Sequence, residues 1–228
     1  MYGQYVPPEQ LMKDRSEYAR KGIARGRSVV AMEYDDGILL LAENKSATLR
    51  KLSELYDRIA FAAVGKYSEF EELRIVGVRL ADTRGYAYGR EDVTAKTIAN
   101  AYSQALSAIF TQQPKPYEVE VLVAELGHEE ESMRMYHVLF DGSVNDVKGY
   151  VGIGGHAEQL TDALDGAFRS QMGLADAVQA AVTALGSVET AGATEAASLE
   201  AAVLDRNRKG RRKFRRLEDT ELAGILTA

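Results

Sequence analysis

The first strongly apolar stretch of the chain is the feature that most limits its fold. Residues 28–34 read Ser-Val-Val-Ala-Met-Glu-Tyr, the turn Asp35-Asp36-Gly37 follows, and residues 38–42 read Ile-Leu-Leu-Leu-Ala. Asp-Gly between two such runs is a strong hairpin signal. Because nearly every position is apolar, rather than every second one, both faces of the sheet must be covered. The hairpin therefore predicts a sheet that lies between other layers of the protein.

Patterns elsewhere surround this hairpin with helices and further strands. Helical spacing of apolar residues predicts helices over residues 67–88, 94–112, 157–169, 174–185 and 218–226. Strand patterns cover residues 52–56, 59–64, 118–126, 135–140, 150–154, 199–204 and 214–217. This order predicts the α+β class, with two stacked antiparallel sheets between helical layers. No long linker interrupts residues 1–228, so we expect a single domain.

The segment ahead of the hairpin divides into a tail and a helix. Residues 1–7 have no usable period, whereas residues 8–25 have a helical one that begins at Pro8. Gly26 is suited to end this helix in a left-handed conformation, and Gly22 inside it marks a close backbone approach. An enzyme that used the first residue of the following strand as a free-amine nucleophile could not keep this extension.

Composition removes several classes of function. The net charge of −6 gives no general attraction to nucleic acid or anionic membranes, and the lack of cysteine excludes disulfides and thiolate metal sites. We expect no membrane span and no signal peptide, because no apolar run reaches about 18 residues. The histidines His128, His137 and His156 match no metal spacing. The expected protein is cytoplasmic and needs no metal or cofactor.

Two local patterns have a structural and a functional interpretation. Eight basic residues lie between Arg206 and Arg216, with Phe214 as their one aromatic. The run predicts a hairpin turn with a solvated surface rather than a nucleic-acid patch. Gly152, Gly154 and Gly155 precede a predicted helix. They indicate a tight strand-to-helix turn rather than a phosphate site.

Several sequence strings carry a more specific signal. They are residues 8–10 (Pro-Glu-Gln), 15–26 (Arg-Ser-Glu-Tyr-Ala-Arg-Lys-Gly-Ile-Ala-Arg-Gly), 53–58 (Ser-Glu-Leu-Tyr-Asp-Arg), 81–88 (Ala-Asp-Thr-Arg-Gly-Tyr-Ala-Tyr) and 115–119 (Lys-Pro-Tyr-Glu-Val). With the order of elements, they resemble the alpha subunits of the 20S proteasome core, of the actinobacterial type. The resemblance extends from Pro8 to about Leu226. It implies a four-layer αββα sandwich of the N-terminal-nucleophile hydrolase type.

The resemblance implies a subunit without catalysis of its own. In the related beta subunits a propeptide is removed, and the exposed threonine supplies both nucleophile and base. The comparable position here lies at residues 26–28 and holds no threonine. The implied partners are copies of this chain in a seven-membered ring, a proteasome beta subunit, and a ring-shaped AAA ATPase, with no nucleic acid or membrane. The ATPase would deliver proteins tagged by the small ubiquitin-like modifier of actinobacteria.

The same match implies a docking pocket between neighbouring alpha subunits. Lys51 would pair with the C-terminal carboxylate of the ATPase, since a flexible ammonium can act as a point charge. The other matched pocket and rim positions are Gly65, Lys66, Gly26, Glu17 and Arg20. Archaeal relatives have leucine at the position of Lys66. The implied gate consists of Met1, Tyr2, Gly3, Gln4, Tyr5, Val6, Pro7 and Pro8.

Alternatives stay open at this point. Catalytic subunits also carry a lysine near the position of Lys51, and a self-processing hydrolase would cut before Ser28 and use that serine. A stand-alone scaffold without a protease partner is a third possibility. Residue by residue, Lys51 is otherwise a solvated loop lysine and Gly65 a strand-to-helix turn. Residues 1–7 are otherwise an ordinary loose terminus.

Overall fold

A computed structural model describes residues 7–46, 48–128, 133–188 and 196–227. Two antiparallel five-stranded sheets form its centre, in the orders β10-β9-β2-β1-β8 and β3-β4-β5-β6-β7. The strands are β1 (Val29–Tyr34), β2 (Gly37–Glu43), β3 (Leu52–Tyr56), β4 (Ile59–Gly65), β5 (Val119–Leu126), β6 (Met133–Val138), β7 (Val144–Val147), β8 (Tyr150–Ile153), β9 (Leu199–Asp205) and β10 (Phe214–Arg216).

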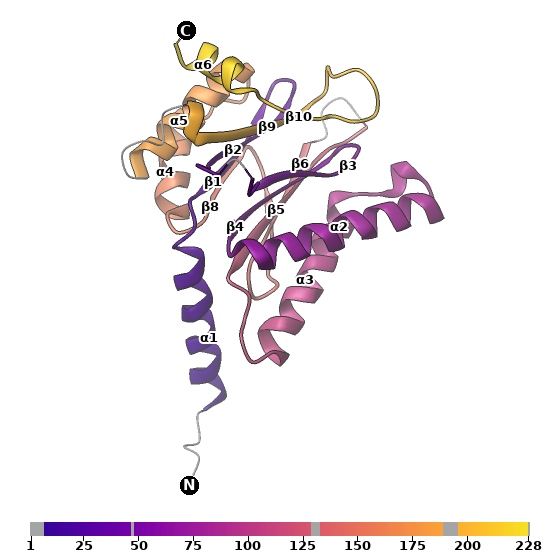
Figure 1. The fold of residues 1–228 in the computed structure, drawn as a ribbon, viewed down its shortest axis with the longest axis vertical. Helices are drawn as coiled ribbons and strands as arrows, with labels where there is room; N and C mark the ends of the chain where they lie inside the picture. The colour runs from indigo at the N-terminus through magenta and orange to yellow at the C-terminus, as the bar shows by residue number, and fades with distance from the viewer. Residues whose placement is uncertain (1–6, 47, 129–132, 189–195, 228) are drawn as a thin grey trace.

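Helices cover the outer face of each sheet (Figure 1). The α-helices are α1 (Pro8–Ile23), α2 (Tyr67–Ala87), α3 (Ala95–Gln112), α4 (Ala157–Ala167), α5 (Leu174–Val188) and α6 (Asp219–Thr227). Short 3₁₀ helices are η1 (Arg90–Asp92) and η2 (Ala196–Ser198). Helices α2 and α3 share an apolar cluster with β3 to β6, and α4, α5 and α6 share one with β1, β2 and β9. The predicted four-layer αββα sandwich is confirmed.

The first hairpin shows why its sequence is apolar on both faces. Val29 and Ala31 point into the cluster between the two sheets, whereas Val30 and Met32 point into the cluster under α4 and α5. All four side chains are at most 1% exposed. Each fully buried side chain of this size contributes about 1.5–3 kcal/mol to stability, so successive residues stabilise two different cores.

The structure differs from the sequence-based expectation at several element ends. Strand β7 was not predicted, because its sequence Val-Asn-Asp-Val includes two poor strand formers, and the strand lies at a sheet edge. Strand β6 ends at Val138 rather than at residue 140, since Leu139 already bonds across the turn to Ser143. Helix α4 ends two residues earlier than predicted, at Ala167.

The structure also corrects the expected roles of Gly22 and Gly26 in the N-terminal segment. Helix α1 ends at Ile23, the cap Ala24 is right-handed, and Gly26 does not have positive φ. A Cβ at Gly22 would lie 1.9 Å from Oε2 of Glu118, so a carboxylate side chain rather than a backbone makes the close approach. Both glycines are therefore explained by close packing and not by turn conformation.

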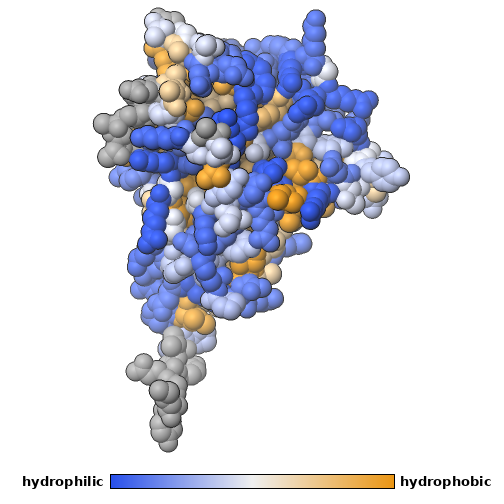
Figure 2. All heavy atoms as spheres, in the orientation of Figure 1, coloured by the Kyte–Doolittle hydropathy of each residue, from blue (hydrophilic) through white to orange (hydrophobic). Residues whose placement is uncertain are grey.

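The face of the molecule shown in Figure 2 is largely hydrophilic, with small separate apolar spots. Tyr86 and Tyr88, near the end of α2, are the most exposed of the large hydrophobic residues that the structure describes. Within the described ranges, each helix is too short or too polar to cross a membrane.

Candidate functional site

The last turn of α1 is anchored to the start of β5 and to the space between the sheets. Ala19 and Ile23 are at most 2% exposed and belong to the inter-sheet cluster. The Glu118 side chain lies against Gly22, and Lys115 holds that carboxylate through a contact of 2.7 Å. The chain that leaves α1 is therefore fixed in place as it turns into β1.

Lys51 reaches this same place from the opposite side. Its Nζ donates to the Arg27 carbonyl oxygen at 2.7 Å, although 24 positions separate the two residues. The Lys51 carbonyl accepts from Ala63 of β4 at 3.2 Å. The Lys51 ammonium thus contacts the connection between α1 and β1, and this contact is exposed to solvent.

Gly26 and Gly65 form the backbone wall beside this lysine. A Cβ at Gly26 would lie 3.0 Å from the amide nitrogen of Gly65 and 3.0 Å from Cγ1 of Val64. Gly65 has φ of +111°, and a Cβ there would be 1.9 Å from the Glu118 carbonyl oxygen. Both residues are glycine because two backbone segments meet, and the predicted strand-to-helix turn at Gly65 is confirmed.

Lys66 begins this turn, but its side chain has an ionic partner within α2. Its Nζ is 3.4 Å from Oε1 of Glu69, and Lys115 contacts the same oxygen at 2.6 Å. The Lys66 amide donates to the Glu118 carbonyl at 2.9 Å. A lysine at this position therefore contributes to an ion-pair cluster at the start of α2, which a leucine could not join.

Glu17 and Arg20 have their contacts elsewhere on α1. Glu17 pairs with Lys21 at 3.9 Å on the exposed face, and the Arg20 guanidinium lies 5.9 Å from the centre of the Phe140 ring. Arg20 also lines a cavity of about 490 Å³ with Glu120 and the start of α4. The structure therefore brings Lys51, Gly26, Gly65 and Lys66 into one region, while Glu17 and Arg20 belong to the flank of the helix.

The proposed gate residues 1–6 lie outside the described residues.

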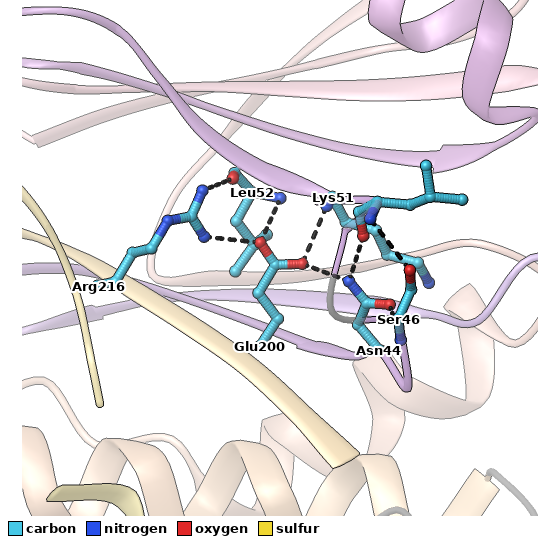
Figure 3. Close-up of polar contacts among 7 residues, drawn as sticks. Asn44, Ser46, Lys51, Leu52, Glu200 and Arg216 are labelled. Atoms are coloured by element: carbon cyan, nitrogen blue, oxygen red, sulfur yellow. Dashed lines mark hydrogen bonds and ion pairs between the residues drawn. The ribbon is translucent and has the colours of Figure 1, made fainter. Parts of the chain in front are cut away.

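A buried carboxylate that sequence reasoning missed supports Lys51 (Figure 3). Glu200 of β9 is 3% exposed, and its two oxygens accept from the amides of Lys51 and Leu52 at 2.9 and 3.2 Å. Asn44 and Arg216 donate to the same carboxylate, each at 2.7 Å. The sequence feature that could have indicated Glu200 is a glutamate within the apolar run Leu-Glu-Ala-Ala-Val-Leu of residues 199–204. A charged side chain in such a run is buried only where it has hydrogen-bonding or ionic partners.

The serine considered as a nucleophile is inaccessible in this structure. Ser28 is 0% exposed and stands directly before β1. Its hydroxyl oxygen faces Gly154, where a Cβ would be 3.4 Å away. Nearby, the buried Glu43 carboxylate lies 3.4 Å from the Arg27 guanidinium and 3.8 Å from Lys45. The site therefore combines cations and backbone groups with two buried acids, Glu200 and Glu43, and the partly exposed Lys51 ammonium is the group in it suited to hold an incoming anion.

The histidines lie on separate elements, and their contacts are local. His137 contacts Glu120 at 3.3 Å and His156 contacts Gln159 at 3.1 Å, while His128 lines a cavity near the β3–β4 turn. Across the ranges that the structure describes, acidic and histidine side chains form no group of three able to hold a metal.

The basic run forms the predicted β9–β10 hairpin, but much of it is not simply solvated. Lys213 donates to two carbonyls of its own loop, at 2.8 and 2.6 Å. Its pKa is lowered by burial and then by nearby arginines, Arg58 first. Arg212 pairs with Glu54, and Arg215 pairs with Glu221 at 2.8 Å. The predicted hairpin is confirmed, and each of its eight basic residues is exposed or partly exposed. Through Arg212 and Glu54 the hairpin also contacts β3 of the other sheet.

Comparison with known proteins identifies the family. The family model described as Proteasome subunit matches residues 23–204. A protein described as Proteasome subunit alpha, from Thermomonospora curvata, is 55% identical over 222 residues, which cover 97% of this chain and 96% of the relative. Proteins with the same description from Kineococcus radiotolerans and Paenarthrobacter aurescens are 55% and 53% identical, and each match covers at least 96% of both chains.

The geometry of Gly65 predicts the result of one substitution. Gly65→Ala should lower the free energy of unfolding by at least about 2 kcal/mol, since it adds strain at positive φ and a backbone clash. Urea unfolding at fixed protein concentration measures the change. Gly224→Ala in α6 is the matched control, because open space surrounds it. It should be neutral or stabilise by up to about 1 kcal/mol. Equal stability of the two variants would contradict this account of Gly65.

Proposed function

The chain belongs to the proteasome subunit family, as an alpha subunit, and we propose on that basis that it docks an activating ATPase and controls substrate access without catalysing proteolysis. The main support is the position of the Lys51 ammonium, 2.7 Å from the Arg27 carbonyl in the connection between α1 and β1. This is where the family resemblance expects the terminal carboxylate of an activator. Lys51, Gly26 and Gly65 would form one wall of each pocket, and a neighbouring copy would supply the other.

The chemistry of this wall suits a carboxylate ligand. Lys51 is partly exposed, so an incoming anion can reach its ammonium while the surrounding protein reduces screening by water. A charge-assisted hydrogen bond to a carboxylate is about twice as strong as a neutral one. Lys66 is assigned a lesser role, since Glu69 already neutralises it at 3.4 Å.

The proposed absence of catalysis is supported by the packing of α1. Ala19 and Ile23 lie in the inter-sheet cluster, so removing everything before Ser28 would expose apolar core. Ser28 itself is fully buried. These observations favour a permanent helix over a disposable propeptide. They weigh against the self-processing hydrolase, and the stand-alone scaffold has no observation in its favour.

The proposed assembly follows from the family. Seven copies would form an outer ring that stacks on a ring of beta subunits in the cytoplasm, and the beta subunits would cleave substrates that the ATPase delivers. Residues 1–8 from seven copies would close the axial pore. The tails would need different conformations, because seven identical chains cannot occupy one point on the axis.

The first test concerns catalysis by the chain itself. Intact-mass measurement after assembly with the beta subunit should find residues 1–27 still attached, and the purified chain alone should not cleave peptides. The beta subunit of the same preparation is the control, because it should lose its propeptide and react with an active-site threonine blocker. Loss of residues 1–27, with new activity from Ser28, would establish the hydrolase instead.

The second test concerns docking. Lys51→Ala should leave ring assembly and basal peptide hydrolysis unchanged, but reduce ATPase-stimulated protein degradation by about tenfold or more, because the carboxylate loses its charged partner. Lys96→Ala on the exposed surface of α3 is the matched control and should retain full stimulation. Undiminished stimulation of the Lys51 variant would remove the docking assignment.

The third test concerns the gate. Deletion of residues 1–7, behind a new initiator methionine, should raise basal hydrolysis of short peptides several-fold, since nothing would then obstruct the pore. The number of reactive threonines, titrated with an active-site blocker in both assembled particles, separates access from chemistry and should not change with this deletion. If the assembled deletion variant hydrolyses peptides at the rate of the full-length chain, residues 1–7 do not form a gate.

A further inference from the structure

We propose that Glu200 is the positioning residue for the docking lysine: its buried carboxylate holds the backbone of Lys51 so that the ammonium is presented beside the connection between α1 and β1. This inference rests on the proposed docking role of Lys51. It adds a residue that lies 149 positions away in sequence and belongs to the other sheet.

Four hydrogen-bond donors converge on the Glu200 carboxylate. Its carboxylate accepts from the amides of Lys51 and Leu52, from the Asn44 side-chain amide and from the Arg216 guanidinium. Figure 3 shows the carboxylate between these donors, pointing from β9 toward the segment that enters β3. Both carboxylate oxygens therefore accept hydrogen bonds from the Lys51 segment itself or from side chains that contact it.

Glu200 is bound to both ends of this segment, whereas the contacts of Ser46 to the Thr48 and Leu49 amides, at 3.4 and 3.0 Å, are local to it. The connection from β2 to β3 includes the exposed residues Thr48, Leu49 and Arg50 directly before Lys51. Asn44 ties its start by donating to the Leu49 carbonyl at 2.7 Å, and the same amide nitrogen is bound to Glu200. One buried carboxylate thus restrains both ends of the connection.

These hydrogen bonds to the backbone fix the point from which the Lys51 side chain extends. Arg216 also donates to the Leu52 carbonyl at 2.6 Å, so the residue after Lys51 is held at its amide by Glu200 and at its carbonyl by Arg216. With Lys51 bonded to Glu200 through its amide and to Ala63 through its carbonyl, its Cα has a set position. From there the side chain extends to Arg27. A preorganised ammonium binds an anion more tightly because less conformational entropy is lost on binding.

The decisive substitution is Glu200→Gln, which keeps the size of the side chain. A glutamine amide must turn its NH₂ group toward existing donors on one side, either Asn44 and Lys51 or Leu52 and Arg216. The β2–β3 connection would then shift while the sandwich core stays intact. The probe is a peptide with the last residues of the partner ATPase, used with a free C-terminal carboxylate and as the C-terminal amide.

On assembled particles, Glu200→Gln should weaken binding of the free-acid peptide by about tenfold, because buried donors are left without an acceptor and Lys51 is displaced. The concentration of ATPase for half-maximal stimulation should rise, while maximal stimulation and basal peptide hydrolysis stay the same. Hydrogen exchange at the Lys51 and Leu52 amides should accelerate. The amide peptide should bind weakly to wild type and variant alike.

Glu125→Gln is the matched control. Glu125 is also a buried carboxylate, 6% exposed, and it accepts from the Ala95 amide at 2.8 Å, at another site. Its variant should bind the free-acid peptide like the wild type. Equal weakening by both substitutions would mean general destabilisation and would overturn the positioning role. If Glu200→Gln fails to assemble, Asn44→Ala replaces it; it should weaken binding several-fold, and unchanged binding would overturn the role.

Lys51→Ala separates this inference from the function on which it rests. If Lys51→Ala abolishes peptide binding but Glu200→Gln changes it by less than about twofold, the docking function stands and the positioning role is wrong. If Lys51→Ala binds the peptide as tightly as the wild type, the docking function fails and the positioning role fails with it.

Discussion

Burial of both faces of the β10-β9-β2-β1-β8 sheet is the constraint on which the rest of the structure depends. Residues 38–42 of β2 are each 0% exposed, and alternate residues serve the inter-sheet core and the helical layer. A sheet of this kind tolerates no polar side chain or loop within its area unless that group is paired. The groups proposed to dock a ligand, Lys51, Gly26 and Gly65, accordingly lie at or beyond the strand ends, in the region of α1, β1, β3 and β4.

Buried or largely buried carboxylates accept hydrogen bonds from backbone amides at the edges of the core. Glu200 accepts amides at the entrance to β3, Glu125 accepts the Ala95 amide at the start of α3, and Glu69 accepts the Glu118 amide before β5. In each case a chain segment changes direction at the edge of the core, and its amide would otherwise be buried without a partner. Such an amide costs about 1–3 kcal/mol when unpaired, so the carboxylates determine where these segments lie.

Local sequence patterns were enough to predict the layers of the fold. Most features that the sequence did not predict depend on contacts between residues far apart in the chain. The hairpin at Asp36-Gly37 and the α+β order follow from hydrophobic periodicity, and β7 was missed because Asn145 and Asp146 hide its pattern. Lys51 and Gly65 could be selected from a family resemblance. Their meeting beside Arg27, and the support from Glu200, depend on how the two sheets stack, which no spacing within one element encodes.

Glu118 contacts both the proposed docking region, at Gly65, and the N-terminal helix, at Gly22. Its carbonyl oxygen occupies the space where Gly65 would carry a Cβ, and its carboxylate occupies the corresponding space at Gly22 of α1. Lys115 holds that carboxylate at 2.7 Å, which opposes its departure. Close-packed contacts transmit displacement because neither partner can yield without losing packing. A ligand at the proposed docking site that displaced the wall beside Lys51 would therefore press on α1 through Glu118.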